Sequence, residues 1–244
     1  MRMDILGLAG AAVIAVGIAA GGWLVGQGVV EARLGNRTVS VKGLSEREVK
    51  ADLAVWSLRY VASGNDLTEV LRELRGATET VTSFFTDAGL PAGNIEMLSL
   101  DVTDQNAQLY RSGPVEVRYI VAQTVAVRTT EVDKVEAASQ KVGTLVEAGV
   151  VLSNEMGAFG SGPSYVFTRL NDLKPEMIAE ATANARDGAA QFATDSGSRV
   201  GAIRNASQGL FQILPATDIP NMPESRQITK TVRVVSTIDF FLED

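Results

Sequence analysis

Histidine and cysteine are both absent from the 244-residue sequence. Without cysteine there is no thiol nucleophile, and without either residue nearly all structural zinc sites are excluded. The absence of histidine also excludes Ser-His-Asp triads and acid or base catalysis by an imidazole. A lack of cysteine suits an oxidising envelope compartment, although many cytosolic proteins lack it too. The composition therefore removes most of the common routes to enzymatic chemistry.

Basic residues are in the minority. Lys and Arg number 22 against 29 Asp and Glu, which gives a net charge of -7. This is the wrong sign for a protein that binds a phosphate backbone through counterion release, so no nucleic acid partner is expected. Trp56 and the four tyrosines, Tyr60, Tyr110, Tyr119 and Tyr165, do not suggest a base-stacking platform because no basic stripe accompanies them.

A long apolar run lies near the beginning of the sequence. Residues 5–30 carry no charge, and Gln27 is their only strongly polar residue. About 20 helical residues cross the ~30 Å hydrocarbon core of a bilayer. The run therefore predicts one N-terminal transmembrane helix over residues 5–30, after a short tail at 1–4 and before a linker at 31–36.

The alternative for this run is a cleaved secretory signal. Small residues would allow cleavage after Ala19 or Ala20, but Trp23 and further apolar residues would then remain exposed in the mature protein. We therefore expect the anchor to be retained. The short tail with Arg2 is expected inside and residues 31–244 outside the cytoplasm.

The anchor contains closely spaced small residues. Glycine at small-xxx-small spacing lets two membrane helices approach closely enough for their backbones to pack. The candidate positions for such helix packing are Gly17, Gly21, Gly22 and Gly26.

The remainder of the chain alternates between strand and helix patterns. Strands are expected at 37–42, 50–62, 95–102, 115–127, 165–170, 200–206 and 228–241, and helices at about 67–88, 131–148 and 175–197. The order strand-helix-strand-strand occurs twice. This predicts an α+β fold over 37–244, in which two related lobes at about 37–129 and 130–244 have antiparallel sheets packed by helices.

The ends of the predicted helices carry recognisable signals. Asp66 and Glu69 form a capping box at the first helix, and Gly89 ends it. Thr130 is expected to cap the second helix and Gly149 to stop it. Pro175 suits the first position of the third helix. The inner face of that helix is predicted to be small, with Ile178, Ala181, Ala185, Ala189 and Phe192.

An apolar, proline-rich loop is predicted at 207–226. Its prolines, Pro215, Pro220 and Pro223, oppose helix and central-strand pairing. The loop either folds back on its own core or contacts another subunit, and we expect contact in a homo-oligomer larger than a dimer. The candidate contact residues are Leu210, Phe211, Ile213, Leu214, Ile219 and Met222.

No motif in the sequence assembles an active site. The glycine spacing at 157–162 is the reverse of a dinucleotide fingerprint and indicates a turn. Asp101 with Asp104, or Glu46 with Glu48, could face a hard cation, but solvated charges are far commoner. No catalytic, cofactor-binding or metal-ligating residue is therefore predicted, and the protein is not expected to be an enzyme.

Several stretches together resemble the SIMPL-domain family, also catalogued as DUF541. They are TVSVKG at 38–43, AGLPAGNI at 88–95, the long strand around Tyr119, and the Ala-rich helix 179–193 running into SGSRVG at 196–201. The resemblance covers about 37–242. The apolar span is longer than in family members with a cleaved signal peptide.

This resemblance implies an α+β fold with two related lobes, export in bacteria, ring-like or channel-like homo-oligomers in some members, and a link to envelope or oxidative stress tolerance. It supplies no catalytic residues. Our hypothesis is a self-assembling structural protein of the bacterial inner membrane, with its soluble domain in the periplasm or outside. The alternative is a periplasmic ligand-binding or partner-binding, chaperone-like module held at the membrane.

Overall fold

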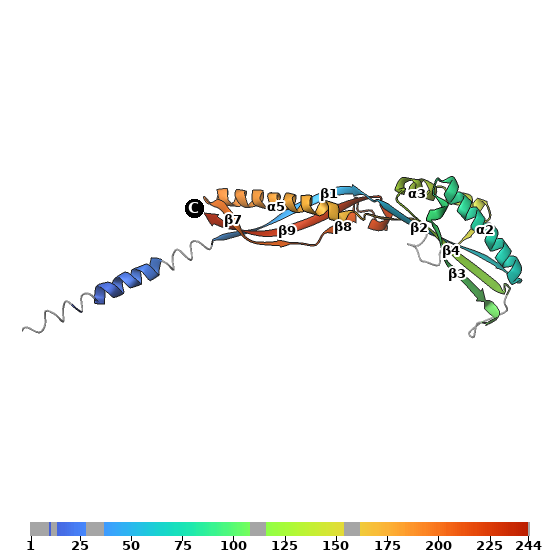
Figure 1. The fold of residues 1–244 in the computed structure, drawn as a ribbon, viewed down its shortest axis with the longest axis horizontal. Coiled ribbons are helices and arrows are strands. Elements are labelled where there is room, and N and C mark those ends of the chain that lie inside the picture. The colour runs from blue at the N-terminus through green and yellow to red at the C-terminus, as the bar shows by residue number, and fades with distance from the viewer. Residues whose placement is uncertain (1–9, 11–13, 28–36, 108–115, 154–161, 244) are drawn as a thin grey trace, which may run out of the picture. The chain divides into compact units, whose positions relative to one another are not determined.

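The computed structural model describes residues 10, 14–27, 37–107, 116–153 and 162–243, which have an α+β fold (Figure 1). The chain forms two compact units, each from stretches distant in sequence. The first comprises Met1–Glu46, Lys174–Gln212 and Arg233–Asp244, and the second Arg47–Leu173 and Ile213–Val232. The lobes expected from the sequence follow chain order instead, so each contributes residues to both units.

The second unit is organised around a five-stranded sheet. The strand order is β3-β4-β2-β5, and β6 also pairs with β2. The bounds are β2 Leu53–Gly64, β3 Ile95–Asp104, β4 Tyr119–Thr129, β5 Val151–Leu152 and β6 Ser164–Val166. Every pair in this sheet is antiparallel, as predicted, and β2 pairs with β4 from Ala54↔Thr129 to Gly64↔Tyr119.

Helix α2, Leu67–Asp87, covers β2 and β4 of this sheet. Asp66 caps it as predicted, because its side chain accepts hydrogen bonds from the backbone N–H groups of Thr68 and Glu69. Gly89 follows with a φ of 78°, which suits the glycine stop predicted there.

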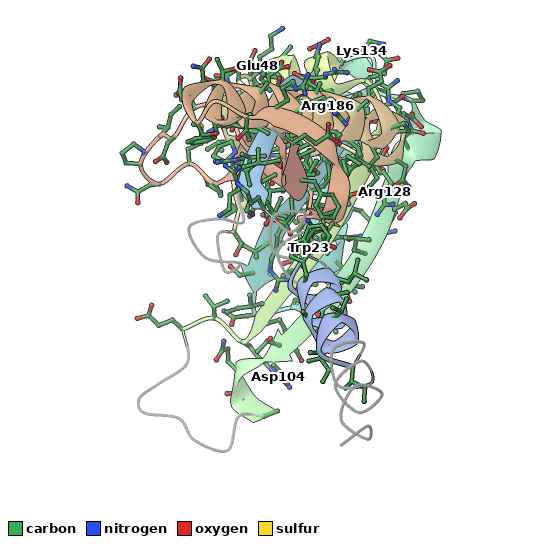
Figure 2. The ribbon with its side chains drawn as sticks, turned by 90° about the vertical axis from the view of Figure 1, so that its left-hand side faces the viewer. Trp23, Glu48, Asp104, Arg128, Lys134 and Arg186 are labelled. Carbon is green, nitrogen blue, oxygen red and sulfur yellow. The ribbon has the colours of Figure 1, made fainter. Side chains whose placement is uncertain are left out.

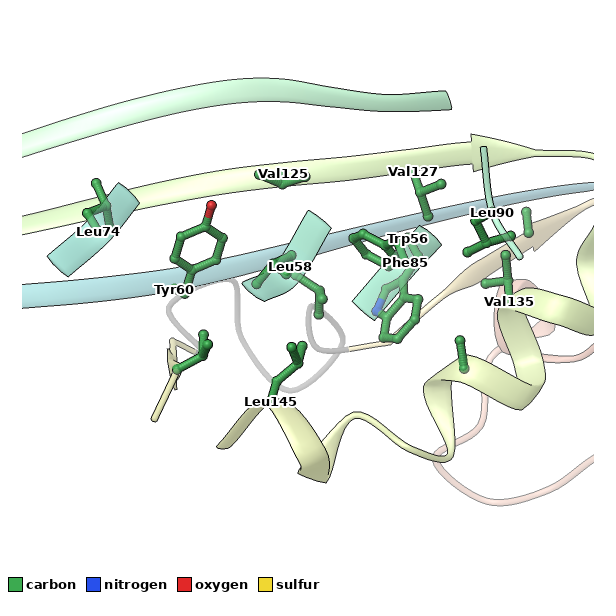
Figure 3. Packing of buried hydrophobic residues seen from close by; sticks show 14 of the residues in the cluster. Trp56, Leu58, Tyr60, Leu74, Phe85, Leu90, Val125, Val127, Val135 and Leu145 are labelled. Atoms are coloured by element: carbon green, nitrogen blue, oxygen red, sulfur yellow. The ribbon is translucent and has the colours of Figure 1, made fainter. Parts of the chain in front are cut away.

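The buried face of α2 builds the main core (Figure 3). Trp56 of β2 meets the rings of Phe84 and Phe85 edge-on, with centroids 6.1 and 5.3 Å away. Such edge contacts are worth about 0.5–1.5 kcal/mol beyond the burial of apolar area. The apolar face of α2 therefore contributes much of the core of the second unit.

The single helix predicted over 131–148 is wrong. Two short helices replace it, α3 at Val132–Ser139 and α4 at Gly143–Glu147. Ser139 Oγ donates to the carbonyl of Glu136, and Gly143 has a low helix propensity, so both residues weaken a continuous helix.

The ends of this region also differ in part from the prediction. The N-cap is Glu131, without a side-chain cap bond, and Thr130 does not cap the helix. Val146 of α4 is exposed. Gly149 has a φ of 88° and ends α4 as expected.

A four-stranded sheet and one long helix supply the first unit and extend into the second. The strand order is β1-β9-β7, and β8 also pairs with β9. The bounds are β1 Thr38–Lys50, β7 Arg199–Gln208, β8 Gln212–Pro215, β9 Thr229–Glu243 and α5 Leu170–Asp195. Three short 3-10 helices, Ala92–Asn94, Gln105–Ala107 and Glu224–Arg226, complete the described elements.

The core of the first unit is small. It consists of Val41 from β1, Ile238 and Phe240 from β9, and Ala185 and Ala189 from α5. A Cβ atom added to Gly43 of β1 would lie 1.8 Å from the carbonyl oxygen of Ala181 on α5. Only glycine fits beneath the helix at this point.

Helix α5 differs from its prediction in its first residue and in which residues are buried. It begins at Leu170, so Pro175 lies inside the helix and not at its first position. The buried residues follow a strict four-residue step, which leaves Phe192 exposed and Ile178 only half-buried. They are Met177, Ala181, Ala185, Ala189 and Ala193.

Candidate functional site

The apolar N-terminal run is helical wherever the structure describes it, at residues 10 and 14–27. The predicted span extends beyond these residues at both ends. Exposed apolar side chains occur on all sides of the helix, including Trp23 (Figure 2). None of the helices within the described residues is both long and apolar enough to cross a membrane.

The four glycines predicted to pack membrane helices all lie in this described helix. A Cβ atom added at Gly17, Gly21, Gly22 or Gly26 would meet nothing within 4 Å. They therefore leave room for a neighbouring helix, and their role in packing stays a prediction.

The proline-rich loop is partly folded onto its own chain. Ile213 and Leu214 lie half-buried in β8, and Phe211 is half-buried with the ammonium of Lys174 5.8 Å from its ring centroid. Leu210 is not covered in this way, because 88% of it is exposed. Its neighbour Gly209 donates its N–H to the carbonyl of Val235 on β9.

The end of this loop is held by several polar contacts. The side-chain amide of Gln227 donates to the carbonyl of Thr217 at 2.7 Å and accepts from its N–H at 3.2 Å. The side chain of Lys230 is fully buried, and its ammonium binds the carboxylate and the carbonyl of Glu224. These contacts tie residues 217 and 224 of the loop to the chain at 227–230.

The tip of the loop is a tight turn from Ile219 to Met222. Ile219 accepts a hydrogen bond from the N–H of Met222, and Asn221 adopts a φ of 63°, a region that asparagine tolerates better than most residues. Both apolar side chains are exposed. Of the six predicted contact residues, Leu210, Ile219 and Met222 are therefore accessible, and a subunit contact through the loop stays a prediction.

A pocket of about 460 Å³ in the second unit is lined by this turn, α3 and β6. Ile219, Met222 and Glu136 contribute to its lining. Arg226, which also lines it, donates from Nη1 to the carbonyl of Pro163 at 3.2 Å. Burial, followed by the nearby Glu136, raises the pKa of Tyr165 in the pocket wall. The pocket combines an apolar wall with charges of both signs. The sequence analysis missed it, because residues distant along the chain build it.

A second feature that the sequence analysis missed is the apolar surface of β3. Met97, Leu98, Leu100 and Val102 are exposed by 71%, 57%, 54% and 51%. Met97 and Val102 pair with the core residues Val125 and Val121, so they lie on the helix-covered face of the sheet. Because α2 covers β2 and β4, these side chains remain outside its cover.

Three of the four acidic residues that were considered as cation ligands lie against arginines. Asp101 binds Arg59 at 2.7 Å, and Asp104 binds Arg118 at 3.1 Å. The hydrogen bonds from Arg118 lower the pKa of Asp104. Glu46 lies 3.4 Å from an arginine of β9. The described residues include no cluster of acidic side chains suited to a metal ion.

Asp52 joins the start of β2 to the chain after β6. Its carboxylate accepts from the N–H and hydroxyl of Thr168 and from Nε of Arg169. Burial acts to raise the pKa of Asp52, but these hydrogen bonds outweigh it and lower the pKa. The contact is structural, since all its partners hold the same junction.

The comparison with protein families identifies the domain. Residues 39–238 match the model of SIMPL, described as a protein of unknown function (DUF541). The chain belongs to the SIMPL family. The SIMPL match begins in β1 and ends in β9, so it includes residues of both compact units. No curated protein matches the chain.

Proposed function

We propose that this SIMPL protein is a membrane-anchored, self-assembling structural protein of the bacterial cell envelope. The observation that carries the proposal is the N-terminal helix, which is apolar on all sides and exposed. A helix of this kind is unfavourable in water and suits the interior of a bilayer. The uncharged run extends over residues 5–30, which is long enough to span it.

The soluble domain would then stand in the periplasm or outside, as the position of Arg2 in a short tail favours. Its partners would be the bilayer and further copies of itself, with no nucleic acid and no cofactor. The exposed apolar residues of the loop, Leu210, Ile219 and Met222, support contact between copies. A role in envelope or oxidative stress tolerance rests on the resemblance to the family. We expect no enzymatic activity.

Three measurements test the proposal. Intact-mass analysis of the membrane fraction should find the chain uncleaved. A species beginning near Gly21 would refute the retained anchor. The detergent-extracted protein should have the mass of more than two copies. A monomer would refute self-assembly but leave the anchor in place. A reporter that works only in the cytoplasm can be fused after Asp244. Activity of this reporter would show that the orientation is the opposite of the one proposed.

The pocket favours one alternative function, a ligand-binding or partner-binding module held at the membrane. Its volume of about 460 Å³ lies within the usual range for small-molecule sites, and it presents apolar and charged groups together. A ligand at 100 times its Kd would stabilise the protein by about 2.7 kcal/mol. Thermal unfolding with a panel of amphipathic carboxylates and peptides tests this, and Met222→Ser should reduce any shift.

A further inference from the structure

The β3 strand forms one edge of the five-stranded sheet. It pairs with β4 along its length, and no other described strand pairs with it. Its outer side therefore presents backbone N–H and C=O groups that another strand could bind. At the opposite edge of the sheet, the described strands that pair with β2 are short: β5 has two residues and β6 has three. Short strands are a common protection of sheet edges, and β3, with ten residues, lacks it.

The charges of β3 do not protect it either. Its sequence, IEMLSLDVTD, contains no lysine, arginine or proline. Two of its three acidic residues form ion pairs within the same unit, since Asp101 binds Arg59 of β2 and Asp104 binds Arg118. A bulge between Met97 and Ser99 is the one irregularity of its pairing with β4. The edge thus combines open backbone groups, neutralised acids and exposed apolar side chains.

We propose that β3 is the strand through which copies of this chain join, pairing antiparallel with β3 of a second copy. This inference rests on the proposed self-assembly and names its site. A twofold pairing suits the strand, because each copy brings the same apolar side chains, Met97, Leu98, Leu100 and Val102. The internal ion pairs of Asp101 and Asp104 reduce the repulsion between two acidic strands.

The size of the surface fits this occupant. Four large side chains that are more than half exposed offer a few hundred Å² of apolar area, which is comparable to the largest apolar patch of a typical monomer, a feature that is often functional. A stable interface needs about 800 Å² per partner, so the strand backbone and its neighbours would supply the rest. Tethering to one membrane would raise the effective concentration of the second copy.

A twofold contact uses up the β3 edge of both copies, so it closes at a dimer. A larger assembly therefore needs a second surface, for which the loop at 207–226 remains the candidate. The two contacts predict different products when they are disrupted separately. Loss of the β3 contact removes one step of assembly and leaves the other.

The absence of cysteine makes a direct test possible. The full chain would carry single substitutions Met97→Cys, Leu98→Cys or Leu100→Cys, with Val146→Cys as the control at an exposed site of the same unit. A disulfide needs Cα atoms about 4.4–6.8 Å apart, so only positions near a twofold axis should join two copies. We expect a cross-linked dimer from β3 and none from Val146.

A second variant tests the energetic role of the strand. Met97→Lys with Leu100→Lys should weaken the association roughly 100-fold or more, because four ammonium groups would meet in one interface. Val146→Lys with Val151→Lys introduces the same charge at equally exposed positions and should leave the size unchanged. Circular dichroism shows whether the lysine variants are folded. If the β3 variant unfolds, the cysteine cross-links alone decide whether β3 forms the contact between copies.

The outcomes separate the two proposals. If the native chain is oligomeric but β3 neither cross-links nor responds to lysine, this inference is wrong and self-assembly stands. A native chain that is monomeric in membranes and in detergent would overturn both. A cross-link from β3 to a different protein would show that β3 binds that protein and not a second copy, which would also refute the inference.

Discussion

Replacing Gly43 by alanine tests how closely α5 approaches β1. The new Cβ atom would lie 1.8 Å from the carbonyl oxygen of Ala181 and 2.7 Å from the amide nitrogen of Ala185. Both are backbone atoms, so no side chain can rotate away. A real contact needs at least 3.0 Å, and the helix or the strand must therefore move by about 1.2 Å, the difference between 3.0 and 1.8 Å.

This displacement would open the core of the first unit. Ala185 and Ala189 pack there against Val41, Ile238 and Phe240, and small side chains cannot extend to fill a gap. Overpacking of a core usually costs about 1–3 kcal/mol, and we expect the upper end of this range because the clash is with backbone. Urea unfolding followed by circular dichroism measures the loss.

A second glycine gives a matched control. Gly188 lies on α5 itself, and an added Cβ atom there meets nothing within 4 Å. Gly188→Ala should stabilise the protein by up to about 1 kcal/mol, because alanine has a higher helix propensity. If Gly43→Ala is as stable as the native protein, or if both substitutions destabilise it equally, the close approach of α5 and β1 is refuted.

Three further predictions concern the second unit and the loop. Glu224→Leu should destabilise the protein by about 3–5 kcal/mol in urea unfolding, since it removes the carboxylate that neutralises the buried ammonium of Lys230, and Lys230→Met should cost less. The pKa of Asp52 is lowered in the folded state, so the stability that it contributes is present above pH ~4 and is lost as the pH falls through the folded pKa. The difference in unfolding free energy between the native chain and Asp52→Asn should therefore decrease as the pH falls below ~4. A difference that stays constant with pH would contradict this prediction. Phe211→Ser with Leu214→Ser should shift the detergent-extracted protein to smaller species with native-like circular dichroism, whereas unfolding would place both side chains in the core.

Some elements could be predicted because local signals decide them. Helix α2 has an apolar stripe, the cap Asp66 and the stop Gly89, and all three act within a few residues. The SIMPL family was recognised from short stretches in the same way, and the match over 39–238 confirms it. The antiparallel sheets follow from the alternation of apolar and polar residues along each strand.

Other elements could not be predicted because distant contacts decide them. The break between α3 and α4 depends on the hydrogen bond of Ser139 and on Gly143, which a periodic pattern over 131–148 does not register. The exposed side chains of β3 look like core residues until the strand order places them at an edge. The pocket is lined by residues as far apart in the sequence as Glu136, Tyr165 and Met222, which no local pattern brings together.

The order of the strands has a consequence for synthesis of the chain. The only described neighbour of β1 is β9, and about 180 residues separate the two strands along the sequence. At roughly 5–20 residues per second, β1 waits about 10–40 s for its partner on the ribosome. The second unit, whose last residue is Val232, can close before the first, which also needs Arg233–Asp244. An unpaired, newly made β1 therefore stays open to pairing with other strands while translation continues.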